Sequence, residues 1–247
     1  MSLARASAEF NSPTGQIVRY SFAGVRPSPR AVVAVTNACR ASALSAFHVL
    51  TGARDSFVLS GHCGDGSPDR EHRHAYFLPE IGADGTIVGM LVVNPSSRFS
   101  REETEALRMV RVIRWNGPST MIHAEFSDGD DSAARQLATR WVSATPYVPL
   151  RRYWGTHGKH HLTPEKQLAL ELHGIGVGKS VAEADVTQQG IVGVRVGTMT
   201  RKRHGPGEAP RRRGFRVEFR THDPICGPVA LGHSCHYGLG LFVPAER

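Results

Sequence analysis

The sequence predicts an α+β fold in which two ferredoxin-like (RRM-like) domains follow one another and the second contains a C-terminal glycine-rich loop. In the first half, hydrophobic periodicity gives the order strand, helix, strand, strand, helix, strand. This is the split βαβ plan, in which helices cover one face of an antiparallel sheet. An acidic turn over 128–131 marks a boundary, and the second half fits a degenerate copy of the same plan. We therefore expect an N-terminal domain over 16–127 and a C-terminal domain over 138–247.

The first strand and the first helix are the clearest elements of the N-terminal domain. Alternating apolar residues predict a strand over 17–22. Ser28 is placed to cap a helix that has Pro29 at its first position, and Gly52 is a plausible end. Helical spacing puts Cys39 on the apolar face, so its thiol is expected in the core.

A capping box starts the second helix of this domain, because Glu103 can reach back to the backbone N–H of Ser100. Its buried stripe is expected to reach Ile113. The other elements expected in this domain are strands over 74–79, 86–93 and 120–126, with a turn at 83–85. The C-terminal domain is expected to contain strands over 141–148, 190–196, 215–220 and 239–243, and a helix over 163–174.

Charge, cysteine count and the lack of long apolar runs indicate the kind of partner and the cellular compartment. A formal net charge of +8 favours an anionic partner such as nucleic acid. Four cysteines are too few for a disulfide scaffold at this length. The N-terminus has no apolar signal region, and no run approaches the ~20 apolar residues of a membrane span. We expect a cytoplasmic protein with reduced thiols and no membrane partner.

Basic residues gather in the run that precedes the glycine-rich loop. The run contains glycines and prolines, so it is expected to form a mobile hairpin or loop rather than a helix. The alternative is a solvated basic segment without a ligand. The residues expected to contact phosphates here are Arg201, Lys202, Arg203, Arg211, Arg212, Arg213 and Arg216.

The glycine-rich loop over 227–240 is expected to take part in the same contact. Its glycines permit positive φ and close approach of a polyanion to the backbone. The residues expected to contact the phosphates are Gly232, His233, His236, Gly238 and Gly240.

The end of the chain also carries a resemblance to a known family. The pattern G-P-x-A-L-G-x-x-x-H-[FY]-G-L-G-L-F over 227–242 resembles the processing half of the fused type I-U (I-G) protein of CRISPR systems. More broadly, the loop resembles that of the repeat-processing endoribonucleases of the RAMP superfamily. The segments 60–79 and 141–149 extend the resemblance over most of the chain from about Val18. The fused relatives are longer, and their half that caps the other end of the guide has no counterpart here.

The resemblance implies a function in antiviral defence. It implies an endoribonuclease that binds the stem-loop of CRISPR repeat RNA and cuts it without metal or other cofactor, leaving a 2′,3′-cyclic phosphate and mature guide RNA. The expected partners are the precursor and mature RNA and other subunits of the CRISPR effector complex. The alternative is a non-catalytic RNA-binding structural subunit of that complex.

Histidines are the candidates for the catalytic groups, because imidazole suits either proton transfer of RNA cleavage. His72 and His74 leave the same face if they lie in a strand. His48 lies on the polar face of the first helix, and His62 and His236 are further candidates. The alternative for each is a packing histidine.

Two other motifs are set aside. Residues 174–180 resemble a P-loop, but His173 stands where the first glycine is required. Cys63 with His72 and His74 lacks the paired spacing of a zinc site, so no metal is expected.

Overall fold

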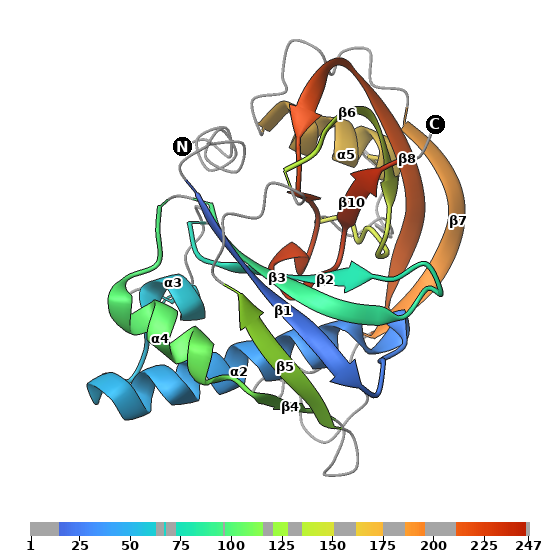
Figure 1. Cartoon of the computed structure of the whole chain (residues 1–247). Helices are drawn as coiled ribbons and strands as arrows, with labels where there is room; N and C mark the ends of the chain where they lie inside the picture. The colour runs from blue at the N-terminus through green and yellow to red at the C-terminus, as the bar shows by residue number, and fades with distance from the viewer. Residues whose placement is uncertain are drawn as a thin grey trace. The chain divides into compact units, whose positions relative to one another are not determined.

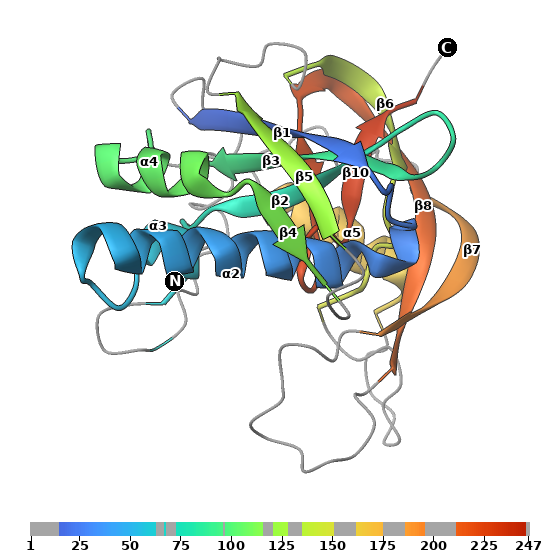
Figure 2. The same ribbon diagram turned by 60° about the horizontal axis from the view of Figure 1, so that its bottom comes forward.

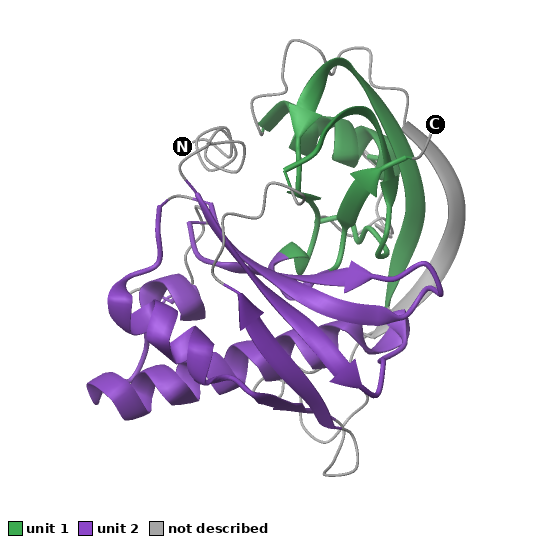
Figure 3. Cartoon of the chain, viewed as in Figure 1, with its two compact units in different colours: residues 1–8, 133–235, 239–247 green, residues 9–132, 236–238 purple. Residues whose placement is uncertain are grey.

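The structure is a computed structural model of the 247-residue chain. It describes residues 15–62, 67, 73–95, 97–115, 121–127, 135–150, 162–174, 186–195 and 211–245. The chain divides into two compact units (Figure 3). Unit 2 comprises Glu9–Ser132 and His236–Gly238, and unit 1 comprises Met1–Ala8, Ala133–Cys235 and Leu239–Arg247. His236–Gly238 thus belong to unit 2 although the chain on both sides of them belongs to unit 1.

Unit 2 contains a five-stranded antiparallel sheet in the order β2-β3-β1-β5-β4. Four of these strands have the order of a ferredoxin-like sheet, and the short β4 extends it at one edge. The strands are β1 (Gln16–Gly24), β2 (Tyr76–Ile81), β3 (Ile87–Asn94), β4 (Val112–Arg114) and β5 (Met121–Ser127).

The helices of unit 2 are α2 (Val32–Thr51), which follows the 3-10 turn η1 (Pro29–Ala31), α3 (Phe57–Ser60) and α4 (Arg101–Met109). Figures 1 and 2 show α2 and α4 on the same face of the sheet. Ser28 caps the first turn, Gly52 ends α2 with φ 69°, and the capping box of Ser100 and Glu103 is present. These three predictions are confirmed, as is the burial of Cys39.

Unit 1 repeats the strand order of unit 2. Its sheet has the order β7-β8-β6-β10-β9, so β6, β7, β8, β10 and β9 occupy the positions of β1, β2, β3, β5 and β4. The elements are β6 (Leu137–Ser143), α5 (Pro164–Leu172), β7 (Val186–Arg195), β8 (Arg211–Cys226), β9 (Val229–Ala230) and β10 (Leu241–Pro244). Only Gly227 and Pro228 separate β8 from β9, so the second helix of the plan is missing. The tandem ferredoxin-like fold is confirmed, with this degeneracy in the second copy.

The core of unit 1 lies between its sheet and α5. Trp141, Phe219 and Phe242 are fully buried side chains that pack with Leu168 and Leu172 of the helix. Thr163 accepts a hydrogen bond from the backbone N–H of Lys166 and so caps α5 at its predicted start. Burial of these large rings stabilises the sheet by the hydrophobic effect.

Two elements differ from the sequence prediction. Helix α4 ends at Met109, and Ile113 lies in β4, because the β-branched run after Val110 pairs with β5. β6 ends at Ser143, shortly before Pro146, and not at Val148. The described part of the basic run, from Arg211 onward, belongs to strand β8, which pairs antiparallel with β7 and so agrees with the hairpin alternative of the prediction.

No helix within the described ranges is long and apolar enough to cross a membrane.

Candidate functional site

Three aromatic side chains of unit 2, His74, His236 and Tyr76, form a ring stack. The ring centroids of His74 and His236 are 3.8 Å apart with an interplanar angle of 25°. The ring of His236 is also 3.9 Å from that of Tyr76, whereas His74 and Tyr76 are 6.4 Å apart. His236 therefore lies between the other two rings. His236 is only 8% exposed and Tyr76 6%, while His74 is half-buried.

The backbone of Gly61 supports the His74 ring. A methyl group on the Gly61 Cα would lie 2.8–2.9 Å from three atoms of the imidazole, so only glycine permits this approach. Gly61 ends α3 with φ 68°, and Ser56 caps the other end of this helix. The backbone N–H of Ala75 donates to Val58 O at 2.8 Å, which ties the segment after His74 to the same helix.

A short helical turn, η5 (Cys235–Tyr237), carries His236. The Thr36 hydroxyl oxygen lies 2.9 Å from the carbonyl oxygen of Tyr237, and the Arg40 guanidinium lies 5.4 Å from the Tyr237 ring centroid. A methyl group at Gly238 would lie 2.6 Å from Pro79 Cδ, so the backbone itself packs there. These contacts attach His236 to α2 and β2 of unit 2.

The spacing of the two imidazoles restricts their protonation. Two unit charges about 4 Å apart repel by about 4 kcal/mol at an effective dielectric constant near 20. The doubly protonated pair is therefore disfavoured.

Of the other candidate histidines, His48 and His62 lie outside this stack. His48 is exposed in the last turn of α2, with its Nδ1 3.0 Å from the carbonyl oxygen of Ala53. His72 lies outside the described residues. His62 is exposed, directly after Gly61.

The glycine-rich loop packs largely inside the protein. A methyl group at Gly232 (φ 90°) would lie 2.5 Å from Val148 O, and one at Gly240 (φ 60°) would collide with the carbonyl of Leu231. Gly232, Gly238 and Gly240 are all buried. Their positive φ therefore serves internal backbone packing, which the sequence analysis did not consider as their role.

A buried carboxylate anchors the start of this loop within unit 1. Glu171 of α5 accepts hydrogen bonds from the Gly232 N–H at 2.6 Å and from the Tyr147 hydroxyl at 2.8 Å. Burial raises the pKa of Glu171 to about 7, although both hydrogen bonds act in the opposite direction. Burial, with the charge of Arg212, lowers the pKa of His233 to about 4, so His233 is neutral at pH 7 and offers no charge to a phosphate.

The described basic residues of the predicted RNA contact lie on β8. Arg213 and Arg216 are exposed and Arg212 is half-buried, while Arg201, Lys202 and Arg203 lie outside the described residues, and for Arg211 only the strand backbone is described.

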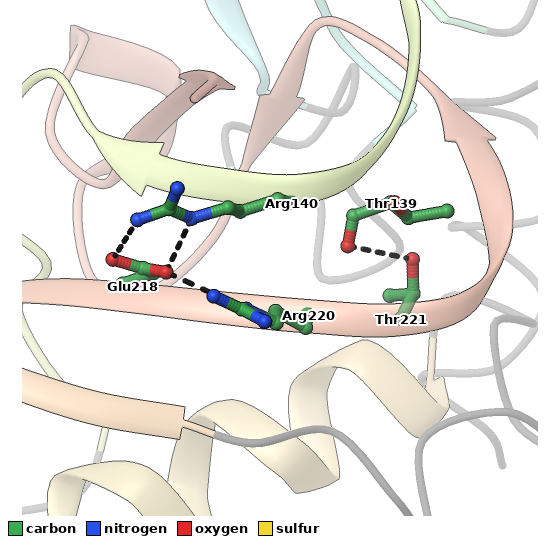
Figure 4. A network of polar contacts seen from close by, with 5 residues as sticks. All are labelled: Thr139, Arg140, Glu218, Arg220 and Thr221. Carbon is green, nitrogen blue, oxygen red and sulfur yellow. Dashed lines mark hydrogen bonds and ion pairs between the residues drawn. The ribbon is translucent and has the colours of Figure 1, made fainter. Parts of the chain in front are cut away.

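Glu218 and Arg220 lie further along β8. Arg140 of the neighbouring strand β6 binds the Glu218 carboxylate in bidentate geometry at 2.6 and 3.1 Å, and Arg220 lies 3.7 Å from the same carboxylate (Figure 4). The three side chains together carry one net positive charge. Arg140 was not predicted to be an RNA-contact residue, because it lies outside the basic run in the sequence. Only the sheet register brings it beside β8.

Within the described ranges, no three His, Cys, Asp or Glu side chains gather in a way that suits a metal ion. Cys63 and His72 of the excluded zinc motif lie outside those ranges, as do residues 175–180 of the P-loop-like segment.

Comparison with known proteins finds similarity at the level of structure. No protein-family profile and no curated protein sequence matches the chain. The solved structures it resembles include proteins described as Cas6b, as Cas6-related and as a RAMP protein. One, described as Cas6b, has a TM-score of 0.52 and 12% identity over 94% of this chain and 99% of its own.

Two further structures are similar at lower scores. One is described as a RAMP protein binding different RNA substrates (TM-score 0.47, 12% identity, 94% of this chain and 99% of its own). The other is described as the product of a Cas6-related gene from Pyrococcus furiosus (TM-score 0.48, 10% identity, the same coverage). At 12% identity the likeness to the Cas6b structure establishes that this chain shares its fold.

Proposed function

We propose that this chain is an endoribonuclease that cleaves CRISPR repeat RNA without a metal ion, and that His74 transfers a proton in the reaction. The observation that carries the proposal is the ring stack, in which a half-buried imidazole lies 3.8 Å from a second, buried imidazole. An imidazole titrates near neutral pH and is suited to proton transfer at the 2′- or 5′-oxygen of a ribonucleotide.

The reaction consists of one displacement at phosphorus. The 2′-oxygen forms a bond to phosphorus, the bond from phosphorus to the 5′-oxygen breaks, and a 2′,3′-cyclic phosphate and a 5′-hydroxyl result. The 2′-hydroxyl loses one proton and the 5′-oxygen gains one. We assign one of these transfers to His74 and leave the other to water. The ring of His236 packs against that of His74 and holds it in place.

The shared fold, the C-terminal motif and the charge of +8 support the choice of RNA as substrate. A structure described as Cas6b has this fold, and the resemblance of 227–242 to the type I-U (I-G) protein gives the finer assignment. Arg212, Arg213 and Arg216 of β8 are proposed to contact phosphates, with other CRISPR effector subunits as partners after cleavage.

The second candidate function is a non-catalytic RNA-binding subunit of a CRISPR effector complex. The burial of His236 and Tyr76 favours it, because stacked rings at 6–8% exposure also serve as core packing. The two candidates differ in one measurable property, which is cleavage of bound RNA.

Cleavage of a labelled repeat stem-loop RNA in EDTA tests the proposal. We expect cutting to persist in EDTA, with a cyclic phosphate at the new 3′ end. An RNA with a 2′-deoxy nucleotide at the cut site should bind and stay intact. Tight binding with no cutting of the normal RNA would support the non-catalytic subunit, and loss of cutting in EDTA would indicate a metal-dependent enzyme.

Single substitutions assign the proton transfer. His74→Ala should lower the cleavage rate by about 10²–10⁴-fold. His72→Ala and His48→Ala test the other two predicted residues, and His123→Ala is the matched control because His123 is exposed on β5. If His74 donates the proton, a 5′-thio leaving group should restore cutting by His74→Ala, because a thiolate leaves without protonation.

A further inference from the structure

One face of α2 contacts both segments that support the imidazole pair. Val32, Thr36 and Arg40 are spaced by four residues, so they lie along the same side of the helix. Val32 and Thr36 pack against the backbone of Gly238, and the Thr36 hydroxyl lies 2.9 Å from Tyr237 O. The α2 face therefore contacts the two residues that follow His236.

Arg40 joins this face to the support of His74. Its Nε donates to Leu59 O at 3.0 Å, and its Nη2 donates to Ser60 O. These are the last carbonyls of the four-residue helix α3, which has no further turn to satisfy them. Ser60 immediately precedes Gly61, whose backbone lies against the His74 ring. The same guanidinium lies over the ring of Tyr237, the neighbour of His236.

We infer that Arg40 is a positioning residue that sets the distance between the His74 and His236 rings. It binds the chain one residue before the support of His74 and one residue after His236. A planar guanidinium is able to bind two carbonyls and cover an aromatic ring at once, whereas the single ammonium of lysine is not. The expected effect of Arg40 on the cleavage rate rests on the proposed function, whereas its effect on the distance between the rings does not.

Arg40→Met tests the inference, with two readouts. The first is the set of nuclear Overhauser contacts between the ring protons of His74 and His236 in the RNA-free protein. We expect these contacts in the parent and their loss in Arg40→Met, with Arg40→Lys intermediate. The second is the cleavage rate, which should fall by about 100-fold in Arg40→Met, as for a misplacement of about 1 Å. Affinity for the 2′-deoxy RNA should stay unchanged.

Arg26→Met is the matched control, because it removes the same charge from an exposed ion pair of unit 2 with Asp84. It should keep both the ring contacts and the rate. Arg40→Lys is the milder variant, because it keeps the charge and removes the planar group. It provides the test if circular dichroism shows that Arg40→Met does not fold.

The results separate this inference from the proposed function. Ring contacts at the parental level in the folded Arg40→Met protein, or in Arg40→Lys if it replaces that variant, overturn the inference at any cleavage rate. If the parent cuts no repeat RNA but the variant still loses the ring contacts, the proposed function fails and the positioning role stands.

Discussion

Replacing Gly61 by alanine should displace the His74 ring and reduce cleavage. The added methyl carbon would lie 2.8 Å from the nearest ring atom, and an ordinary contact begins near 3.4 Å. The ring or the α3 end must therefore retreat by about 0.6 Å, because the repulsion between carbon atoms is steep at such distances. A displacement approaching 1 Å costs up to about 100-fold in rate.

Gly52→Ala provides a matched control for this change. Gly52 also ends a helix in the left-handed region, with φ 69° against 68° for Gly61, but a methyl group there meets no atom within 4 Å. Both variants should lose about 1 kcal/mol of unfolding free energy from the left-handed conformation of alanine. Only Gly61→Ala should lose more stability than this and also lose cleavage.

The assay combines urea unfolding with cleavage of the repeat RNA under single-turnover conditions. Equal losses of unfolding free energy and equal cleavage rates in the two variants would show that the contact between Gly61 and His74 affects neither stability nor cleavage. A slow Gly61→Ala protein that keeps the parental ring contacts between His74 and His236 would also contradict the reasoning, because the ring would not have moved.

Three further predictions follow from the charges and the buried groups. Arg213→Ala and Arg216→Ala should each weaken RNA binding and lower the slope of log affinity against log salt by about 1, measured by filter binding. The contribution of Glu171 to stability should fall as pH rises from about 4.5 to about 7, because burial raises its pKa from 4.5 to about 7. His233 acts in the opposite direction, because its pKa is lowered from 6.5 to about 4. Glu171→Gln should therefore make the slope of stability against pH more positive in thermal unfolding, and an unchanged slope would refute the assignment. Burial raises the pKa of the Cys39 thiol far above its usual range, so a thiol reagent should label the half-buried Cys226 and leave Cys39 unreacted until unfolding.

Local signals were sufficient for much of the fold. The cap at Ser28, the stop at Gly52 and the capping box at Ser100 each depend on a few adjacent residues, so periodicity and cap chemistry predict them. Elements decided by tertiary pairing were missed. β4 has only three residues and forms because β5 pairs with it, and β9 has two.

The candidate site was only partly predictable for the same reason. The prediction that His72 and His74 share one face of a strand depends on their spacing of two residues, and the same spacing separates His74 from Tyr76. Nothing local indicates that His236 inserts beside them. The motif around His236 gave the resemblance, and its glycines suggested a ligand. In the structure Gly232 and Gly240 lie against the backbone of Val148 and Leu231, and Gly238 lies against the Pro79 side chain.

The ring stack joins positions that are far apart in the sequence and so in the order of synthesis. His236 is the 162nd residue after His74, so the ribosome adds it long after His74 and Tyr76. Until residue 236 is synthesised and folds back, a nascent chain has only one imidazole of the pair. A polypeptide that stops before residue 236 therefore lacks the complete pair.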